Sequence, residues 1–326
     1  MTTNLRAQHS DCLVATDASE HGLGACTSSL DPALHAEFWR HREQRGAYTW
    51  LAGPAASCLY RHGSEQEVED LDEMIRSAPA PIGRVMIETF DFIELCCGPD
   101  EADGSPPPLS GAVARSGLHV GPRIDLKQHP FWDLGSLRVL EWLLFLVSRG
   151  RLWLLHTAAP CTTFSIARYP RLRSKTKPEG FDPRESKTKL GNLILLRTMA
   201  VLLAIRQLTP FHGSHEHPKS AYSWQWDKIK RLFEMNGCEV LWLSMCSFSA
   251  PYRKDTRLGL VRAPFLRPLA KPCSGFHSHV RLSGSLCSQA ARYPGGFAQE
   301  YAACAYAAFM KEAPALPWAR MTFWVV

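Results

Sequence analysis

The stretch Phe92–Gly98 reads FIELCCG. It completes an apolar run that begins at Val85, and it contains an acidic residue, Glu94, shortly before a turn at Gly98. Short apolar runs bounded by turn residues are typical of buried strands. A second such run, Leu152–His156, follows a helical pattern at Leu137–Ser148. Strand and helix therefore alternate, which predicts an α/β fold with a doubly wound, mostly parallel sheet.

The same pattern continues on both sides of these elements. It predicts one more strand, Glu239–Ser244, and four more helices, at Ser110–Ser116, Asn192–Gln207, Trp226–Met235 and Phe297–Met310. A break at Ser77–Pro81 gives the first boundary. We therefore expect a small irregular N-terminal appendage (residues 1–81), the α/β domain (residues 82–312) and a C-terminal tail (residues 313–326).

Composition excludes several classes of protein. The chain has 326 residues, of which 45% are hydrophobic and 21% charged, so it is neither disordered nor a minimal scaffold. Its 11 cysteines are odd in number and scattered, which indicates reduced thiols in an intracellular compartment. The N-terminus lacks a signal-peptide core, and charged residues interrupt the apolar stretches, so no membrane partner is expected.

Two acidic residues follow predicted strands, where open parallel sheets bind ligands. Glu94 precedes the turn that contains Cys97 and Gly98, and Asp125 lies where a second strand would end. A carboxylate at the second place can hold the hydroxyls of a ribose. Taken alone, both residues are equally well ordinary loop acids.

Cys161 follows the next strand and is presented from a turn, because Pro160 biases the preceding residue away from helix. An isolated cysteine is usually a small buried hydrophobe. Further on, Glu216 lies in the segment Ser214–Ser220, which we expect to be a proline-limited turn after another buried element. The Cys161 thiol and the carboxyl groups of Glu94, Asp125 and Glu216 are thus expected near the ends of successive buried elements.

The ordered motifs Glu-Leu-x-x-Gly, Pro-Cys and Glu-x-Pro resemble those of the S-adenosylmethionine-dependent DNA cytosine C5 methyltransferases, most closely the divergent members carried by eukaryotic retrotransposons. The resemblance covers about Phe90–Met310. Three further segments are similar to that group: Cys246–Leu258, Cys273–His279 and Tyr293–Phe297. The order and spacing carry the resemblance, since each short motif alone is weak.

The resemblance implies a Rossmann-like methyltransferase fold in which the Cys161 thiolate adds to C6 of cytosine. Glu216 would contact the ring N3 and exocyclic amine. The positive sulfonium of the cofactor, or a basic neighbour such as Arg168 or Arg253, would activate the thiol. S-adenosylmethionine is the implied cofactor. The residues matched to its site are Glu94, Cys97, Gly98, Asp125 and Pro160.

The implied partner is DNA, with the target cytosine flipped out of the stack. The basic segment Arg168–Lys189 is suited to phosphate contacts, although such a run is as often a solvated loop. We expect a monomer, and a nuclear location follows from the implied substrate alone. The residues expected to contact nucleic acid are Arg168, Arg171, Arg173, Lys175, Lys177, Lys254 and Arg257.

The sequence departs from the family pattern at three places. The insertion Pro99–Pro108 separates Gly98 from the next helix, Ala159 stands where the family has proline, and His217 follows the matched glutamate. The insertion could be a harmless surface loop or could displace the cofactor-binding backbone. A second interpretation is therefore a catalytically inactive, retroelement-derived remnant that binds nucleic acid.

Two other patterns are weaker. The segment Val14–Ala25 resembles the first strand of a retroelement ribonuclease H domain, with Asp17 at a magnesium position, but the other acids cannot be placed, so we expect a truncated relic. Cys273, His277 and His279, with Cys246 as an optional fourth residue, are of the types that bind zinc. Their spacing is not that of a standard finger, and the sequence predicts no metal.

Overall fold

The computed structural model describes residues 12–19, 22–29, 88–100, 104, 107–283 and 285–316. The chain divides into two compact units, residues 1–67 and 68–326. In the first, β1 (Cys12–Ser19) and β2 (Gly22–Ser29) form an antiparallel hairpin, with Asp17 opposite Gly24. The predicted boundary at residue 81 and most of the predicted tail lie outside the described residues.

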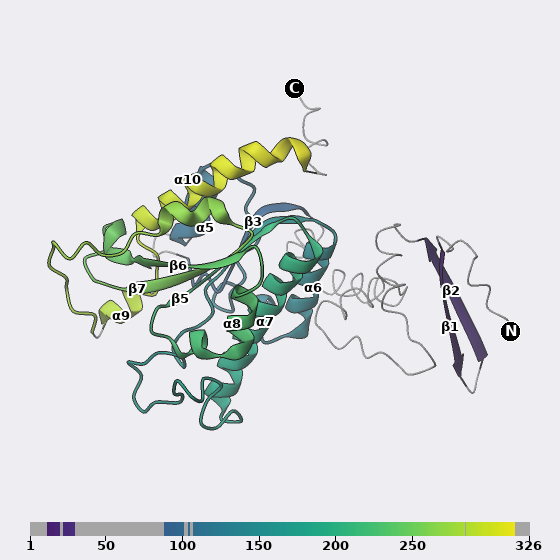
Figure 1. Ribbon diagram of the computed structural model, residues 1–326, viewed down its shortest axis with the longest axis horizontal. Helices are drawn as coiled ribbons and strands as arrows, with labels where there is room; N and C mark the ends of the chain where they lie inside the picture. Colours follow the sequence, from purple (N-terminus) through teal and green to yellow (C-terminus); the bar gives the residue numbers. More distant parts are fainter. Residues whose placement is uncertain are drawn as a thin grey trace. The chain divides into compact units, whose positions relative to one another are not determined.

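The second unit is built on a five-stranded mixed sheet in the order β3-β4-β5-β7-β6. Strands β3, β4 and β5 are parallel, whereas β7 runs antiparallel to both of its neighbours (Figure 1). The strands are β3 (Phe90–Leu95), β4 (Leu152–Thr157), β5 (His212–Pro218), β6 (Cys238–Ser244) and β7 (Asp255–Val261).

The strand expected to end at Asp125 is reduced to two contacts with β3. Isolated parallel bridges join Phe92 to Val120 and Leu95 to Ile124, and the backbone around them forms no regular strand. Gly121 lies so close to β3 that a β-carbon there would come within 2.7 Å of the Ile93 side chain. The chain therefore follows β3 at short range without forming a continuous ladder.

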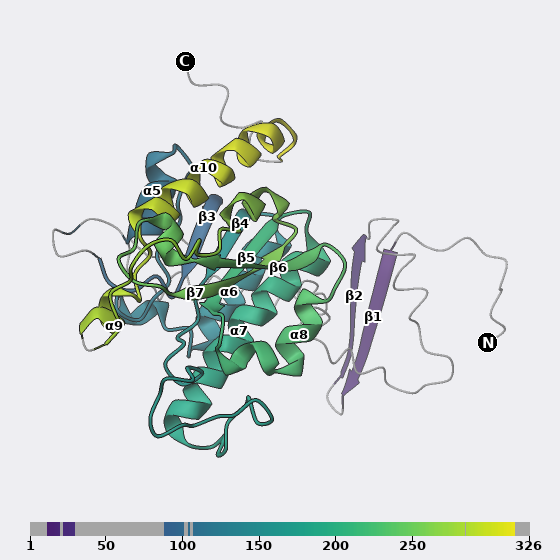
Figure 2. The ribbon, with the colours of Figure 1, turned by 60° about the vertical axis from the view of Figure 1, so that its left-hand side comes forward.

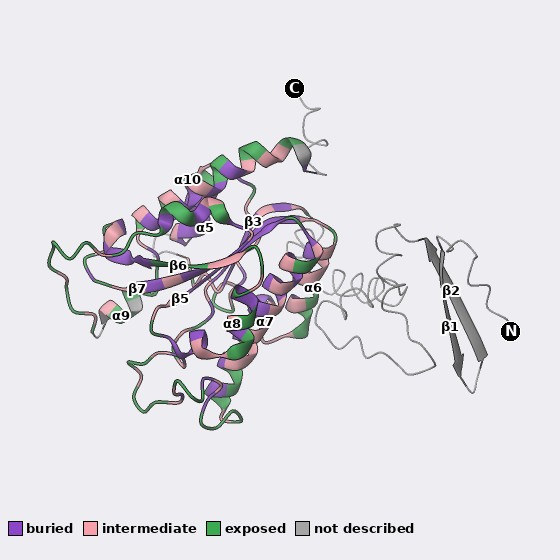
Figure 3. Cartoon of the chain, viewed as in Figure 1, coloured by how far each residue is buried: buried purple, intermediate pink, exposed green. Residues whose placement is uncertain are grey.

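Helices cover both faces of the sheet, which confirms the predicted α/β class and doubly wound arrangement (Figures 1 and 2). One face packs against α6 (Leu137–Ser148), α7 (Ser186–Leu208) and α8 (Asp227–Phe233). The other packs against α5 (Pro108–Arg115) and α10 (Gly295–Glu312). Buried residues follow the sheet and the inner sides of these helices (Figure 3).

Short elements complete the described part of the chain. A five-residue helix, α9 (Ser285–Gln289), precedes α10. The 3-10 helices are η1 (Pro130–Trp132), η2 (Tyr222–Gln225), η3 (Met245–Phe248), η4 (Pro264–Leu269) and η5 (Ala313–Ala315).

The prediction for α7 was wrong at its N-terminus. The helix was expected from Asn192, but it begins at Ser186, inside the predicted basic segment. Glu185 explains the earlier start, because its carboxylate accepts the Thr188 backbone N–H at 2.7 Å and caps the first turn. By length and composition α7 could cross a membrane, yet half of its most apolar stretch is buried within the fold.

Candidate active site at the strand ends

Strand register brings the predicted site segments to one edge of the sheet. Leu95 of β3 lies opposite Thr157 of β4, and Thr157 lies opposite His215 of β5. Because the three strands are parallel, the chain leaves each of them on the same side. Cys161 follows β4 by four residues, and Glu216 lies near the end of β5.

Cys161 starts a tight turn that other residues hold in place. Its carbonyl accepts the backbone N–H groups of Phe164 and Ser165, both at 2.9 Å. Two residues on, the carbonyl and hydroxyl of Thr163 accept hydrogen bonds from the Arg173 guanidinium, both at 3.0 Å. The thiol itself is partly exposed, so the turn presents it while fixing its backbone.

Glu216 lies within β5 and not in a turn, which corrects the expectation for this segment. The strand continues through it because β7 pairs alongside, with Leu258 opposite Glu216. The carboxylate is buried, and its Oε1 lies 3.4 Å from Nζ of Lys254. Lys254 also donates to the Ala290 carbonyl at 3.1 Å, so its ammonium is anchored on two sides.

The charges of these two groups act on Cys161. Burial raises the pKa of the Cys161 thiol, the negative charge of Glu216 raises it further, and the positive charge of Lys254 lowers it. The three side chains therefore share one electrostatic environment. Any opening of the Glu216–Lys254 ion pair changes the nucleophilicity of the thiol.

Arg253 was expected to be the cation near the thiol, but Lys254 is the one that lies beside Glu216. The Arg253 guanidinium is exposed and pairs with Asp255 through two hydrogen bonds, at 3.0 and 3.1 Å. Lys254, expected to contact nucleic acid, is the cation beside Glu216. Neighbouring residues at a strand entrance point to opposite sides, and the sequence could not show which of the two pointed inward.

A buried polar network that the sequence analysis missed lies beneath the site. The His156 ring bonds the Ser214 hydroxyl at 2.8 Å and the Tyr293 hydroxyl at 2.7 Å, and Ser214 bonds Tyr301 at 2.8 Å. Burial lowers the pKa of His156 to about 3, so the ring is neutral. The network joins β4, β5 and α10; His156, a polar residue in the otherwise apolar β4, was the available signal.

The turn after β3 contains two residues in the left-handed region. Cys96 and Gly98 both have positive φ, 60° and 79°, a region that residues with side chains adopt rarely. The Gly98 N–H donates to Oδ2 of Asp125 at 2.9 Å, and the Lys127 N–H donates to Oδ1 at 2.8 Å. Burial raises the pKa of the Cys97 thiol, which keeps it protonated.

The Glu94 carboxylate forms hydrogen bonds within the fold. Its Oε2 accepts the Ser110 backbone N–H at 3.0 Å and also the Ser110 hydroxyl, so the carboxylate caps the first turn of α5. Burial raises its pKa to about 7, and the Ser110 hydrogen bonds oppose this shift. Glu94 therefore stabilises the start of a helix, a role that the sequence analysis did not assign to it.

The first residues of the Pro99–Pro108 insertion fold back over the same turn. Asp100 forms an ion pair with Arg123. The Gln128 amide donates to the Gly98 carbonyl at 2.7 Å and to Asp100 at 3.1 Å. We call Asp100, Arg123 and Gln128 the clasp. The last inserted residue, Pro108, is the first residue of α5, and residues 101–103, 105 and 106 lie outside the described part.

The Asp125 carboxylate, which is hydrogen-bonded to this turn, has acceptor sites suited to the ribose hydroxyls of a nucleoside cofactor. Each oxygen of the Asp125 carboxylate accepts one backbone N–H, and a carboxylate oxygen has a second acceptor site for a hydroxyl. Pro160 is exposed at the end of the neighbouring strand, β4. The clasp lies beside this carboxylate, because Gln128 contacts the same glycine that Asp125 holds.

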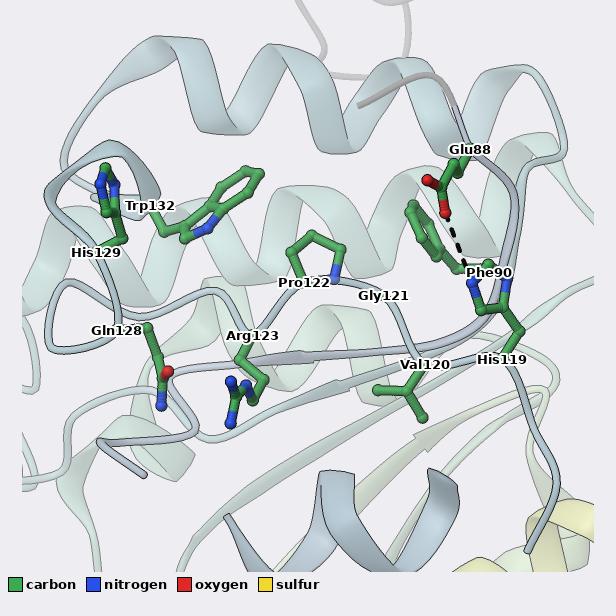
Figure 4. Close-up of a pocket in the computed structure, with 10 residues that line it drawn as sticks. All are labelled: Glu88, Phe90, His119, Val120, Gly121, Pro122, Arg123, Gln128, His129 and Trp132. Carbon is green, nitrogen blue, oxygen red and sulfur yellow. Dashed lines mark ion pairs between the residues drawn. The ribbon is translucent and has the colours of Figure 1, made fainter. Parts of the chain in front are cut away.

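A cavity of about 400 Å³ lies beside β3, on the side of the two isolated bridges (Figure 4). Phe90, Gly121, Pro122 and Trp132 form its apolar part, and Arg123 lines it as well. Neither Glu94 nor Cys161 lines this cavity. An ion pair between His119 and Glu88, at 3.6 Å, lies at one end.

Arg173 does not belong to a nucleic-acid surface, which corrects that prediction. Its side chain is fully buried and donates to the carbonyls of Pro178 and Thr188 and to Asn192, besides Thr163. Its guanidinium also lies 3.7 Å from the centre of the Phe164 ring. Arg173 thus ties the Cys161 turn to α7.

The other predicted phosphate contacts differ in exposure. Arg171, Lys175 and Lys177 are exposed, as the prediction requires. Arg168 is half-buried, and its Nε has no hydrogen-bond partner among the described residues. Arg257 lies on β7, 5.9 Å from the Trp224 ring centre, and lines a second cavity of about 410 Å³.

No protein-family model matches the chain, and no curated protein matches it in sequence. Among solved structures, the chain is similar to the crystal structure of the S. pombe Dnmt2 methyltransferase, with 13% identity and a TM-score of 0.28. The match covers 59% of this chain and 57% of that one, little more than half of either. A likeness of this size says nothing about activity, so the function must be argued from the geometry of the strand ends.

Proposed function

We propose that this chain is an S-adenosylmethionine-dependent DNA cytosine C5 methyltransferase with Cys161 as its nucleophile. The observation that carries the proposal is the placement of Cys161 beside the buried Glu216–Lys254 ion pair at the ends of two parallel strands. A thiol, a buried carboxylate and a cation are the groups that addition to a cytosine ring requires. The family resemblance of the motifs in sequence supports the same assignment.

In the proposed reaction, the Cys161 thiolate forms a bond to C6 of cytosine, and the electrons of the C5–C6 double bond make C5 nucleophilic. Glu216 holds the ring N3 and exocyclic amine as charge develops there. Lys254 keeps the carboxylate oriented and favours the thiolate. When bound, the cofactor would supply the methyl group to C5. The C5 proton would then pass to solvent, and its bonding electrons would restore the C5–C6 double bond as the Cys161 sulfur leaves.

The remaining assignments follow from this reaction. Asp125 and the Cys96–Gly98 turn would bind the cofactor, with Pro160 at the neighbouring strand end. The target base would be flipped out of the duplex, and Arg171, Lys175 and Lys177 would contact the phosphates. We propose a monomer that acts in the nucleus without a membrane partner.

Trapping on DNA that contains 5-fluorocytosine tests the proposal. Fluorine at C5 cannot leave as a proton would, so the Cys161 adduct persists as a covalent complex. The full chain with S-adenosylmethionine should form this complex, and Cys161→Ser should abolish it. The exposed Cys287→Ser is the matched control and should form the complex normally. Trapping that survives in Cys161→Ser would exclude the proposed nucleophile.

A second candidate function is favoured by the clasp. Asp100, Arg123 and Gln128 lie over the turn that would bind the cofactor, and Glu94 is already used by α5. A chain closed in this way would be an inactive, retroelement-derived protein that binds nucleic acid. Calorimetric titration of S-adenosylmethionine into the natural chain and into Asp100→Ala separates the two. Binding by the natural chain supports the enzyme; binding by Asp100→Ala alone, or DNA binding without cofactor binding, supports the remnant.

A further inference from the structure

Two cysteines and two histidines converge beyond the end of β6, and one of them, Cys246, is distant in sequence from the other three. Cys246 lies in η3, directly after β6, and Cys273, His277 and His279 lie in the irregular segment 270–283. One ligand atom from each residue lies within 4.8 Å of the ligand atoms of the other three. We propose that these residues form a structural zinc site of the Cys2His2 type, an inference that goes beyond the proposed function.

The distances agree with a tetrahedral zinc ion. Zinc binds sulfur at about 2.3 Å and nitrogen at about 2.0–2.1 Å, so ligand atoms at the corners of a tetrahedron are about 3.4–3.8 Å apart. The Cys273 sulfur lies 3.5 Å from Nε2 of His279 and 3.9 Å from Nε2 of His277. The Cys273 sulfur thus faces ring nitrogens of both histidines, as a shared metal ion requires.

Backbone hydrogen bonds hold Cys273 in place. The Gly275 N–H donates to the Cys273 sulfur at 3.3 Å, and such donors stabilise and orient metal-bound thiolates. Gly275 has a φ of +80°, a backbone conformation that disfavours residues with a side chain. The Cys273 N–H is itself anchored, at 3.0 Å, to the Ser244 hydroxyl at the end of β6.

The segment 270–283 needs a crosslink of this kind. It contains no helix or strand, and its largest apolar side chain, Phe276, is 95% exposed. Apolar packing therefore does little to hold it. By contrast Cys246 is buried against the folded body, so a shared ion would attach the segment to the sheet.

The proposed zinc site also borders the candidate active site. Cys246 follows Met245, whose backbone N–H donates to the Lys254 carbonyl at 3.0 Å. The ion would therefore fix the connection that carries the cation beside Glu216. Two thiolates balance the charge of Zn²⁺, and four protein ligands close its coordination shell, which is typical of a structural ion.

Metal analysis of the full chain, purified under reducing conditions without chelator, tests the inference. We expect about one zinc per chain, retained against a weak chelator, and a cobalt-substituted form with the absorption of a tetrahedral thiolate complex. Cys273→Ser should lose the zinc, whereas Cys287→Ser, in nearby α9, should keep it. Zinc content that is absent, or equal in these two variants, would overturn the inference.

A second variant guards against misfolding of the cysteine mutants. His277 is exposed, so His277→Ala should fold normally while its affinity for zinc falls at least about tenfold. Removal of zinc should increase hydrogen exchange in segment 270–283 while β3 and β4 stay protected. Unchanged affinity in His277→Ala would count against the site. None of these readouts requires methyltransferase activity, so the two proposals can fail separately.

Discussion

Glu216 and Lys254 set the charge around the Cys161 sulfur. Because the Glu216 carboxylate raises the pKa of the thiol, Glu216→Gln should increase the rate of Cys161 alkylation at neutral pH. Lys254→Met removes the opposing positive charge and should decrease that rate. We expect each change to be about threefold or more, since both charges lie in a partly desolvated site.

Iodoacetamide labelling across a pH series, read by mass spectrometry at Cys161, measures these rates. The labelling profile should shift to lower pH in Glu216→Gln and to higher pH in Lys254→Met. The exposed Arg253→Met is the matched control, because Arg253 pairs with Asp255 and not with Glu216. Shifts of the same sign in both variants would show that the ion pair does not act through its charges.

Glu94 makes stability depend on pH. Its pKa is about 7 in the fold, above its ordinary value of 4.5, so the folded state binds a proton more tightly than the unfolded state does. The resulting stability is fully present below pH 4.5 and is lost as the pH rises toward 7. From the two pKa values, the loss is up to about 3 kcal/mol.

Urea unfolding of the wild type and of Glu94→Gln, across this pH range, checks the prediction. The glutamine keeps an oxygen that can accept the Ser110 N–H but does not titrate. The free energy of unfolding should fall with rising pH in the wild type and fall less in the variant. Parallel pH profiles would mean that Glu94 keeps an ordinary pKa in the fold.

At the scale of elements, α10 depends on a close approach at Gly296. A β-carbon there would lie 2.8 Å from the Phe248 carbonyl oxygen, a backbone atom that cannot rotate away. Gly296→Ala should therefore lower the free energy of unfolding by about 1–3 kcal/mol, as overpacking does. Urea unfolding followed by tryptophan fluorescence would measure the loss.

The neighbouring glycine provides the control. A β-carbon at Gly295 meets no atom within 4 Å, so Gly295→Ala should be neutral or slightly stabilising. The two variants make the same chemical change one residue apart on the same helix. Equal effects would show that helix propensity, and not contact with η3, decides the outcome.

The periodic pattern of apolar residues was sufficient to predict the bounds of a helix or strand where the local sequence alone determines that element. Helix α6 has the predicted bounds, Leu137–Ser148, because its apolar residues recur on the side that packs against the sheet. β4 was predicted to within one residue, since an unbroken apolar run suits a strand buried on both faces. Such elements are specified locally.

Periodicity failed where long-range contacts decide the structure. Glu216 was expected in a turn, because His-Glu-His-Pro reads as polar, yet pairing with β7 extends β5 through it. Arg173 looked like one more cation of a solvated segment, and only the acceptors of α7 and the Cys161 turn explain its burial. The convergence of Cys246 with Cys273 likewise depends on tertiary contacts.

In the molecule as a whole, some positively charged side chains are held by internal partners, and others are exposed to solvent. The chain carries a net charge of +6, but Arg173 and Lys254 are held by internal partners. Lys175 and Lys177 lie with Arg171 on the exposed segment after the Cys161 turn, at the lower edge of Figure 1. This segment is therefore where we expect a phosphate backbone to bind.

Replacing Arg171, Lys175 and Lys177 together by alanine should weaken binding to double-stranded DNA and reduce its salt dependence. Each lost phosphate contact lowers the slope of log affinity against log salt by about 0.9, so three contacts lower it by up to about 3. Fluorescence anisotropy of a labelled duplex, measured over a range of salt concentrations, gives this slope.

A charge-matched variant separates local contacts from net charge. Replacing Lys228, Arg231 and Lys311 by alanine also removes one arginine and two lysines, all exposed, and leaves the same net charge of +3 (+6 less three). Lys228 and Arg231 lie on α8 and Lys311 lies on α10, outside the basic segment Arg168–Lys189. If the segment forms the interface, only the first variant loses slope, because counterion release depends on the phosphates in contact. Equal losses of slope in the two variants would mean that DNA binding depends on the overall charge of the chain. The assignment of Arg171, Lys175 and Lys177 as phosphate contacts would then be wrong.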